Sequence, residues 1–147
     1  MVTAVGVGIK SEFAVVTQDL LSLEYDALEA YKAAIGRLDN EEYRQKMIEF
    51  SEAHKRHINE LSKSLSEHDV DVPSGPDMKK WLTQGKVVLA NLIGDKTILA
   101  AMRSNEADVN TAYERINARN DIWDDARDII RRGLEDERKH TEWLDKV

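Results

Sequence analysis

Residues 137–140 of this chain read Glu-Arg-Lys-His, and this short segment decides how the rest of the sequence is interpreted. On a helix, two side chains three residues apart lie on the same face, so this glutamate and histidine point the same way. Residues 54–57 read His-Lys-Arg-His, a similar segment with a histidine in the first position. Each segment follows a glutamate at nearly the same distance: His57 comes 33 residues after Glu24, and His140 comes 34 residues after Glu106.

A second spacing repeats in the same two halves of the chain. Tyr31 comes seven residues after Glu24, and Tyr113 comes seven residues after Glu106. Two helical hairpins that direct carboxylate and imidazole groups toward one interior are typical of a metal site in a four-helix bundle. The doubled pattern therefore predicts an all-α protein with such a site.

The composition fits one helix-rich domain that spans residues 1–147. Of the 147 residues, 41% are hydrophobic and 33% are charged, with only two prolines and seven glycines. A net charge of −7 argues against nucleic acid as a partner, because phosphate backbones bind clustered Lys and Arg. The absence of cysteine excludes zinc fingers and iron–sulfur clusters, so a metal ion would be bound by carboxylate and imidazole groups.

The cellular location follows from what the sequence lacks. No stretch contains the ~18 consecutive apolar residues of a membrane helix, so no membrane partner is expected. Residues 1–10 are apolar at first but have no basic residues before the apolar part, and we interpret them as an N-terminal extension rather than a signal peptide. A cytoplasmic protein is the expectation.

The apolar residues recur every three or four positions, which predicts four long helices. They cover about residues 11–38, 40–68, 95–117 and 121–147, with Asn40 and Asp95 as N-caps. Prolines and a glycine interrupt the pattern after the second helix, so residues 69–94 are expected to form a long crossover with a short helix near 77–81. The result is two antiparallel hairpins with short turns, joined by one long connection.

Each predicted helix carries a titratable residue on its apolar face near the middle. An ionised group in an apolar interior is unfavourable unless it is paired or bound to a metal. Iron and manganese ions accept such oxygen and nitrogen ligands without sulfur. The candidate ligands are Glu24, His54, His57, Glu106, Glu137 and His140. Tyr31 and Tyr113 are expected to hydrogen-bond to these ligands from outside.

These motifs resemble the ferritin-like superfamily, and within it the rubrerythrin-like proteins and bacterial families that remain uncharacterised. The family pattern has a Glu on the first helix, Glu-x-x-His on the second, a Glu on the third and Glu-x-x-His on the fourth. This chain matches it at Glu24, Glu106 and residues 137–140, and departs from it at His54. The resemblance implies a ferritin-like four-helix bundle with a di-metal iron or manganese site that reacts with peroxide or oxidises iron.

The departure at His54 leaves alternatives open. In the family, a glutamate at this position bridges both ions, and a neutral imidazole cannot bridge in the same way. The consequence would be a single ion such as zinc, or no metal at all, with protonated histidines paired to the glutamates. The function is then either that of a redox metalloprotein or that of a non-catalytic bundle acting as a stress-related or interaction module. Trp123 is expected to face outward, and we expect a homodimer.

Overall fold

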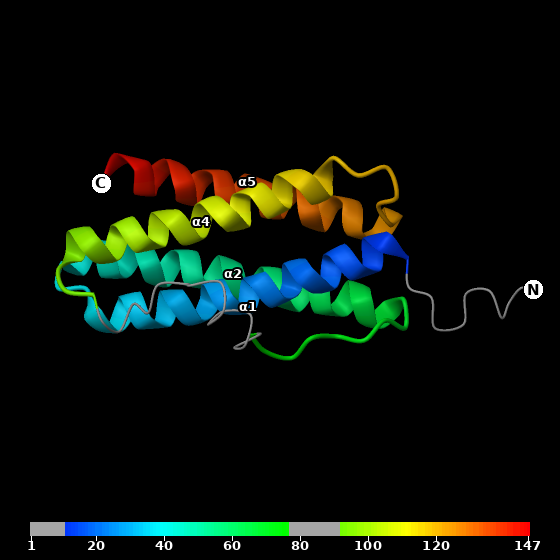
Figure 1. Cartoon of the computed structure of the whole chain (residues 1–147), viewed down its shortest axis with the longest axis horizontal. Coiled ribbons are helices and arrows are strands. Elements are labelled where there is room, and N and C mark those ends of the chain that lie inside the picture. Colours follow the sequence, from blue (N-terminus) through cyan, green and yellow to red (C-terminus); the bar gives the residue numbers. More distant parts are fainter. Residues whose placement is uncertain (1–10, 77–91) are drawn as a thin grey trace, which may run out of the picture.

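The computed structural model describes residues 11–76 and 92–147 of the chain. Within these ranges all regular structure is helical: α1 (Glu12–Arg37), α2 (Glu41–Glu67), α4 (Asp95–Asn117) and α5 (Asp124–Lys146) form a four-helix bundle (Figure 1). The prediction of an all-α bundle is confirmed for this part of the chain. None of the described helices combines the length and the apolar character needed to cross a membrane.

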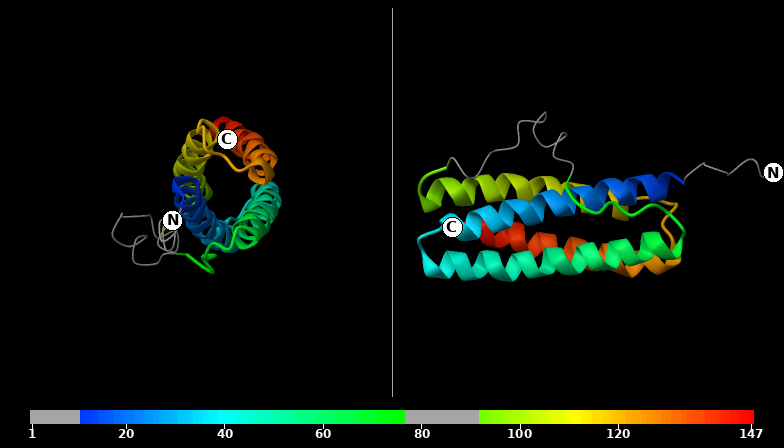
Figure 2. Two further views of the ribbon diagram at one scale, coloured as in Figure 1. Left: turned by 90° about the vertical axis from the view of Figure 1, so that its right-hand side faces the viewer. Right: turned by 90° about the horizontal axis from the view of Figure 1, so that it is seen from below.

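The helices are arranged as two antiparallel pairs. α1 packs along α2, α4 packs along α5, and the pairs meet where α1 contacts α4 and α2 contacts α5 (Figure 2). α2 ends at one end of the bundle and α4 begins at the opposite end (Figure 1). Of the predicted crossover 69–94, the structure describes only the two ends. The short helix expected near 77–81 and the N-terminal extension 1–10 lie outside the described residues.

The N-caps show where the sequence prediction was right and where it was wrong. Asn40 caps α2, because its side chain accepts a hydrogen bond from the backbone N–H of Tyr43 at 3.0 Å. Asp95 does not cap α4: the cap is Gly94, with φ at 91°, and Asp95 is the first helical residue. The Asp95 carboxylate instead accepts the backbone N–H groups of Asp39 and Asn40, both at 2.8 Å. It therefore fastens the start of α4 to the α1–α2 turn.

The α4–α5 turn also differs from the prediction. α5 begins at Asp124 rather than near Asp121, because Asp121 accepts hydrogen bonds from Arg119 within the turn. Trp123 is not outward-facing: it is partly buried and stacks on His68, with ring centroids 3.7 Å apart. The expected homodimer loses this support and stays a prediction.

The apolar core is divided into two clusters, one in each half of the bundle. One contains Phe13, Leu21, Leu61, Ile116 and Ile130, and the other contains Ala34, Met47, Ile98, Met102 and Leu144. Burying each large apolar side chain contributes about 1.5–3 kcal/mol to folding. Five of the six candidate ligands are buried at positions between these clusters along α2, α4 and α5, and the sixth, Glu24, is buried on α1 beside the first cluster. The bundle thus encloses a polar layer between two apolar ends.

The role of Asp95 can be tested by Asp95→Ala. The substitution removes two hydrogen bonds to exposed backbone N–H groups, so we expect a loss of about 1 kcal/mol in the free energy of unfolding. Urea denaturation measures this value. Lys96→Ala, at an exposed neighbouring position, is the matched control and should change stability little. Equal effects of the two substitutions would contradict this role.

Candidate metal centre

The structure brings all six predicted ligands together in the middle of the bundle. Their side chains come from every described helix, and each residue is at most 4% exposed. They form two overlapping groups, within each of which one ligand atom per residue lies within 4.8 Å of the others. The first group is Glu24, His54, His57 and Glu137, and the second is His54, Glu106, Glu137 and His140. This buried cluster could hold a metal ion.

Both helical pairs contain an equivalent glutamate–histidine contact. His57 Nδ1 lies 2.7 Å from Glu24 Oε2, which joins α2 to α1. His140 Nδ1 lies 3.0 Å from Glu106 Oε2, which joins α5 to α4. The repeated spacing in the sequence therefore corresponds to a repeated contact in space.

The remaining two ligands, His54 and Glu137, lie between these contacts. His54 Nδ1 makes a short hydrogen bond with Glu24 Oε1, and His54 Nε2 lies 2.9 Å from Glu106 Oε1. Glu137 Oε1 is 3.6 Å from His54 Nε2. Among the described residues, neither carboxylate oxygen of Glu137 has a hydrogen-bond partner, although both are buried. A buried polar group without a partner costs about 1–3 kcal/mol, and more if it is charged.

The charges of the cluster are balanced by protonation when no metal is present. Burial alone would raise the pKa of Glu24, but the charge and hydrogen bond of His54, together with His57, lower it to about 2. Burial acts against a charged His54, yet the surrounding carboxylates raise its pKa well above 6.5. Burial and the neighbouring charge of Glu106 raise the pKa of Glu137 well above 4.5, which favours the neutral form of this carboxyl group.

The two tyrosines differ from each other. Tyr113 Oη donates a hydrogen bond to Glu24 Oε2 at 2.6 Å, across the bundle from α4 to α1. Tyr31 is equally buried, but its hydroxyl has no hydrogen-bond partner among the described residues. Its ring lies against His54 instead, with centroids 5.0 Å apart. Tyr113 therefore makes the expected hydrogen bond to a ligand. The Tyr31 hydroxyl lies near Glu106, whose charge, after burial, raises the pKa of Tyr31, but the two groups make no hydrogen bond of normal geometry.

Gly133 makes the position of Tyr113 possible. A Cβ atom at Gly133 would lie 2.3 Å from Tyr113 Cε1 and 2.8 Å from Tyr113 Cζ. The ring of Tyr113 therefore packs directly on the backbone of α5. Only glycine leaves room for this contact, which carries the hydroxyl to Glu24.

Asp136 is a residue of the site that the sequence reasoning missed. His57 Nε2 lies 2.8 Å from Asp136 Oδ2, so His57 contacts Glu24 through one ring nitrogen and Asp136 through the other. Carboxylates in this position orient a ligating histidine. Asp136 also pairs with Arg56 at the surface. Its position next to Glu137 was the available signal, but its contact with His57 joins residues 79 positions apart.

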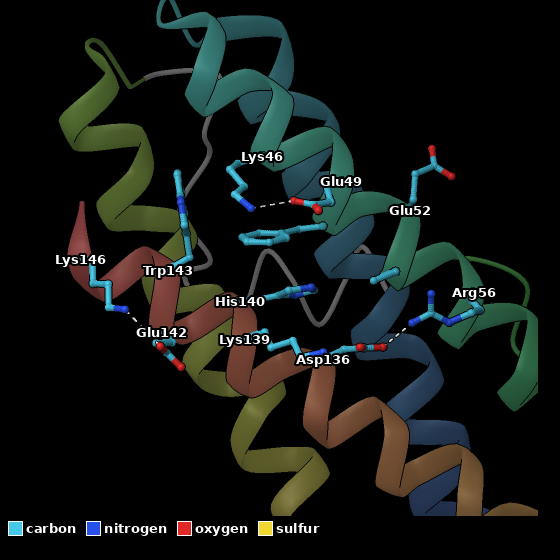
Figure 3. Close-up of a pocket in the computed structure, with 12 residues that line it drawn as sticks. Lys46, Glu49, Glu52, Arg56, Asp136, Lys139, His140, Glu142, Trp143 and Lys146 are labelled. Carbon is cyan, nitrogen blue, oxygen red and sulfur yellow. Dashed lines mark hydrogen bonds and ion pairs between the residues drawn. The ribbon is translucent and has the colours of Figure 1, made fainter.

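A surface pocket of about 490 Å³ reaches the cluster between α2 and α5 (Figure 3). Its wall includes His140 and Asp136, together with the charged side chains Lys46, Arg56 and Lys139. Phe50 stacks on His140 inside it, with centroids 4.1 Å apart. One candidate ligand therefore borders a space that solvent and small molecules can enter.

Gly133→Ala tests the packing beneath Tyr113. Displacing the ring should cost about 1–3 kcal/mol of stability, despite the higher helix propensity of alanine. The matched control is Gly36→Ala, because a Cβ atom at Gly36 meets nothing within 4 Å. We expect the control to be neutral or up to about 1 kcal/mol stabilising. Thermal and urea unfolding measure both, and a neutral Gly133→Ala would contradict the contact.

The protonation pattern predicts how the stability of the metal-free protein depends on pH. The Glu24 contribution is present above pH 4.5 and is lost as the pH falls toward about 2. The His54 contribution is complete below pH 6.5 and is lost as the pH rises through its raised folded pKa. Between these limits, the raised pKa of Glu137 lowers the stability of the protein as the pH rises, and the lowered pKa of His140 increases it. The two effects therefore oppose each other.

We therefore expect maximal stability of the chelator-treated protein near pH 4.5–6.5 and a decline on both sides. Urea unfolding across this range measures the effect. In His54→Gln the decline above pH 6.5 should become clearly smaller, because one of the two histidines with a raised pKa, His54 and His57, has been removed. A wild-type protein that becomes more stable in alkaline solution would contradict this protonation pattern.

Comparison with known proteins places the chain in a family without assigning a chemistry. Residues 15–118 match the family described as Domain of unknown function (DUF2383). The match includes Glu24, His54, His57 and Glu106, and ends before Glu137 and His140. A comparison with curated proteins gave no match. Because the matched range covers most of its length, the chain belongs to the DUF2383 family.

Proposed function

We propose that this protein is a ferritin-like metalloprotein that binds two metal ions in the middle of its four-helix bundle. The observation that carries the proposal is Glu137. Its carboxyl group is fully buried, both oxygens have no hydrogen-bond partner among the described residues, and it belongs to both groups of candidate ligands. The imidazole nitrogens of His54, His57 and His140 lie 3.6–3.7 Å from it, too far for hydrogen bonds. A metal ion on each side would supply the close contacts that this group lacks.

The donor atoms suit transition-metal ions. One ion would be held by Glu24 and His57, the other by Glu106 and His140, with His54 and Glu137 near both. Carboxylate oxygen and imidazole nitrogen suit iron, manganese and zinc. Tyr113 and Asp136 contact Glu24 and His57 from outside, so they would keep these ligands in orientation.

The activity that this arrangement supports best is a redox reaction. The protein would either reduce a small oxidant such as peroxide or oxidise iron as its substrate. Bound iron or manganese would supply electrons to an oxidant such as peroxide. The chain contributes a buried polar layer between two apolar clusters, which keeps bulk water from the ligands. The pocket beside His140 offers a route for a small molecule from solvent (Figure 3).

A second candidate function is favoured by a specific contact. His54 contacts Glu24 and Glu106 at the same time, and its raised pKa makes it a cation between two anions. This arrangement neutralises the two carboxylates without a metal. The protein would then be a non-catalytic bundle, or one with a single zinc ion, that serves as a stress-related or interaction module.

Metal analysis separates the two candidates. We expect protein purified without chelator, or reconstituted with Fe(II), Mn(II) or Zn(II), to contain two ions per chain, one for each ligand group. Glu137→Gln should bind metal at least ~10-fold more weakly, because it removes a charged ligand common to both groups. Glu135→Gln, at an exposed position on α5, is the matched control and should bind like the wild type. Only trace metal in the reconstituted wild type would refute the proposal.

A further inference from the structure

His54 has an unusual position, because its two ring nitrogens face different halves of the site. Nδ1 contacts Glu24 Oε1, which belongs to the first group of ligands. Nε2 lies 2.9 Å from Glu106 Oε1, which belongs to the second group. In contrast, His140 contacts a carboxylate of the cluster through Nδ1. The ring of His54 therefore spans the space between the two groups.

The surroundings of His54 hold the ring in this orientation. The side chain is fully buried, with no exposed surface. The ring of Tyr31 lies against it at a centroid distance of 5.0 Å, and the ring of His140 lies at 5.3 Å. A ring enclosed in this way cannot turn one of its nitrogens to solvent without disturbing the core. Both nitrogens remain directed at ligand groups.

We propose that His54 bridges two metal ions as an imidazolate, with Nδ1 on the ion held by Glu24 and His57 and Nε2 on the ion held by Glu106 and His140. The inference rests on the proposed metal-binding function and specifies how its centre is built. Each nitrogen donates a lone pair to one ion, and the protons that the two nitrogens and the Glu137 carboxyl group carried leave to solvent. No electron is gained or lost in this step.

The charges of the site support this assignment. Glu24, Glu106 and Glu137 supply three negative charges as carboxylates, and an imidazolate supplies a fourth. Two divalent ions are then neutralised within the ligand set. A neutral imidazole would leave one positive charge in a buried site, which is unfavourable. The bridge therefore restores the charge that a glutamate at this position would have contributed.

The bridge also changes the expectation drawn from the sequence. A neutral imidazole cannot bridge two ions, but an imidazolate can, because its two nitrogens lie on opposite sides of the ring. With metal–nitrogen bonds of about 2 Å, the ions would lie about 6 Å apart. Oxygen-bridged pairs lie about 3.5–4 Å apart. A nitrogen-rich centre of this kind favours copper and zinc over manganese.

Copper(II) is a suitable probe, because two Cu(II) ions joined by an imidazolate are magnetically coupled. The full chain, stripped by chelator, is loaded with two equivalents of Cu(II), and copper is counted by elemental analysis. We expect two copper ions per chain, loss of the electron paramagnetic resonance signal of isolated Cu(II), and no copper–copper scattering path near 3.5–4 Å in X-ray absorption.

Variants identify the bridging residue. His54→Gln should restore the signal of uncoupled Cu(II). Glu137→Gln removes the other residue shared by both groups and binds metal more weakly, so it is loaded with excess Cu(II) until two ions are bound; these ions should stay coupled. Circular dichroism verifies the helical fold of each variant. If His54→Gln does not fold, the coupling and the scattering path of the wild type still decide the question.

The outcomes separate the bridge from metal binding itself. Two uncoupled copper ions, a short copper–copper path, or coupling that survives in His54→Gln would overturn the imidazolate bridge and leave metal binding in place. A single copper ion would overturn the bridge as well. Failure to bind copper, iron, manganese or zinc would overturn the proposed function, and the bridge with it.

Discussion

The structure depends on one constraint: a cluster of carboxylates and imidazoles is buried between two apolar layers, where an uncompensated charge is very costly. Every member of the cluster therefore needs a partner. Glu24 and Glu106 have histidines, and His54 has both of these glutamates. Glu137 alone has no hydrogen-bond partner among the described residues. A metal ion could supply the close contacts that Glu137 lacks.

Contacts elsewhere on the helices help to position the residues of the polar layer. Polar contacts join α2 to α5 along one half of their length, from the pair His57–Asp136 through Glu60–Arg132 to Ser64–Asp125. These contacts, together with the packing of Tyr113 on the glycine backbone of α5, hold the ligands at a common depth. The bundle is thus organised around the cluster as much as around its apolar clusters.

The sequence was sufficient to predict the helices and the six clustered residues, because both depend on local periodicity. Residues three, four or seven positions apart share a helix face whatever the rest of the chain does. The doubled spacing of Glu24 and Glu106 with their histidines carried this information. The ferritin-like connectivity and the bound ions remain proposals.

What the sequence could not reveal depends on contacts between distant segments. The carboxylate of Asp95 has the composition of an N-cap, but it is used by a turn 55 residues away. Asp136 contacts His57, and Trp123 stacks on His68, through packing that no short motif records. The orientation of His54 could not be predicted from the sequence either, since it is determined by glutamates on two other helices.

We propose above all that the buried cluster binds two metal ions. Anomalous diffraction at a metal absorption edge, from crystals of protein never exposed to chelator, tests it most directly. We expect two peaks inside the bundle, one beside Glu24 and His57 and one beside Glu106 and His140, with His54 and Glu137 between them. No anomalous density within the cluster, even after metal is supplied during purification, would contradict it.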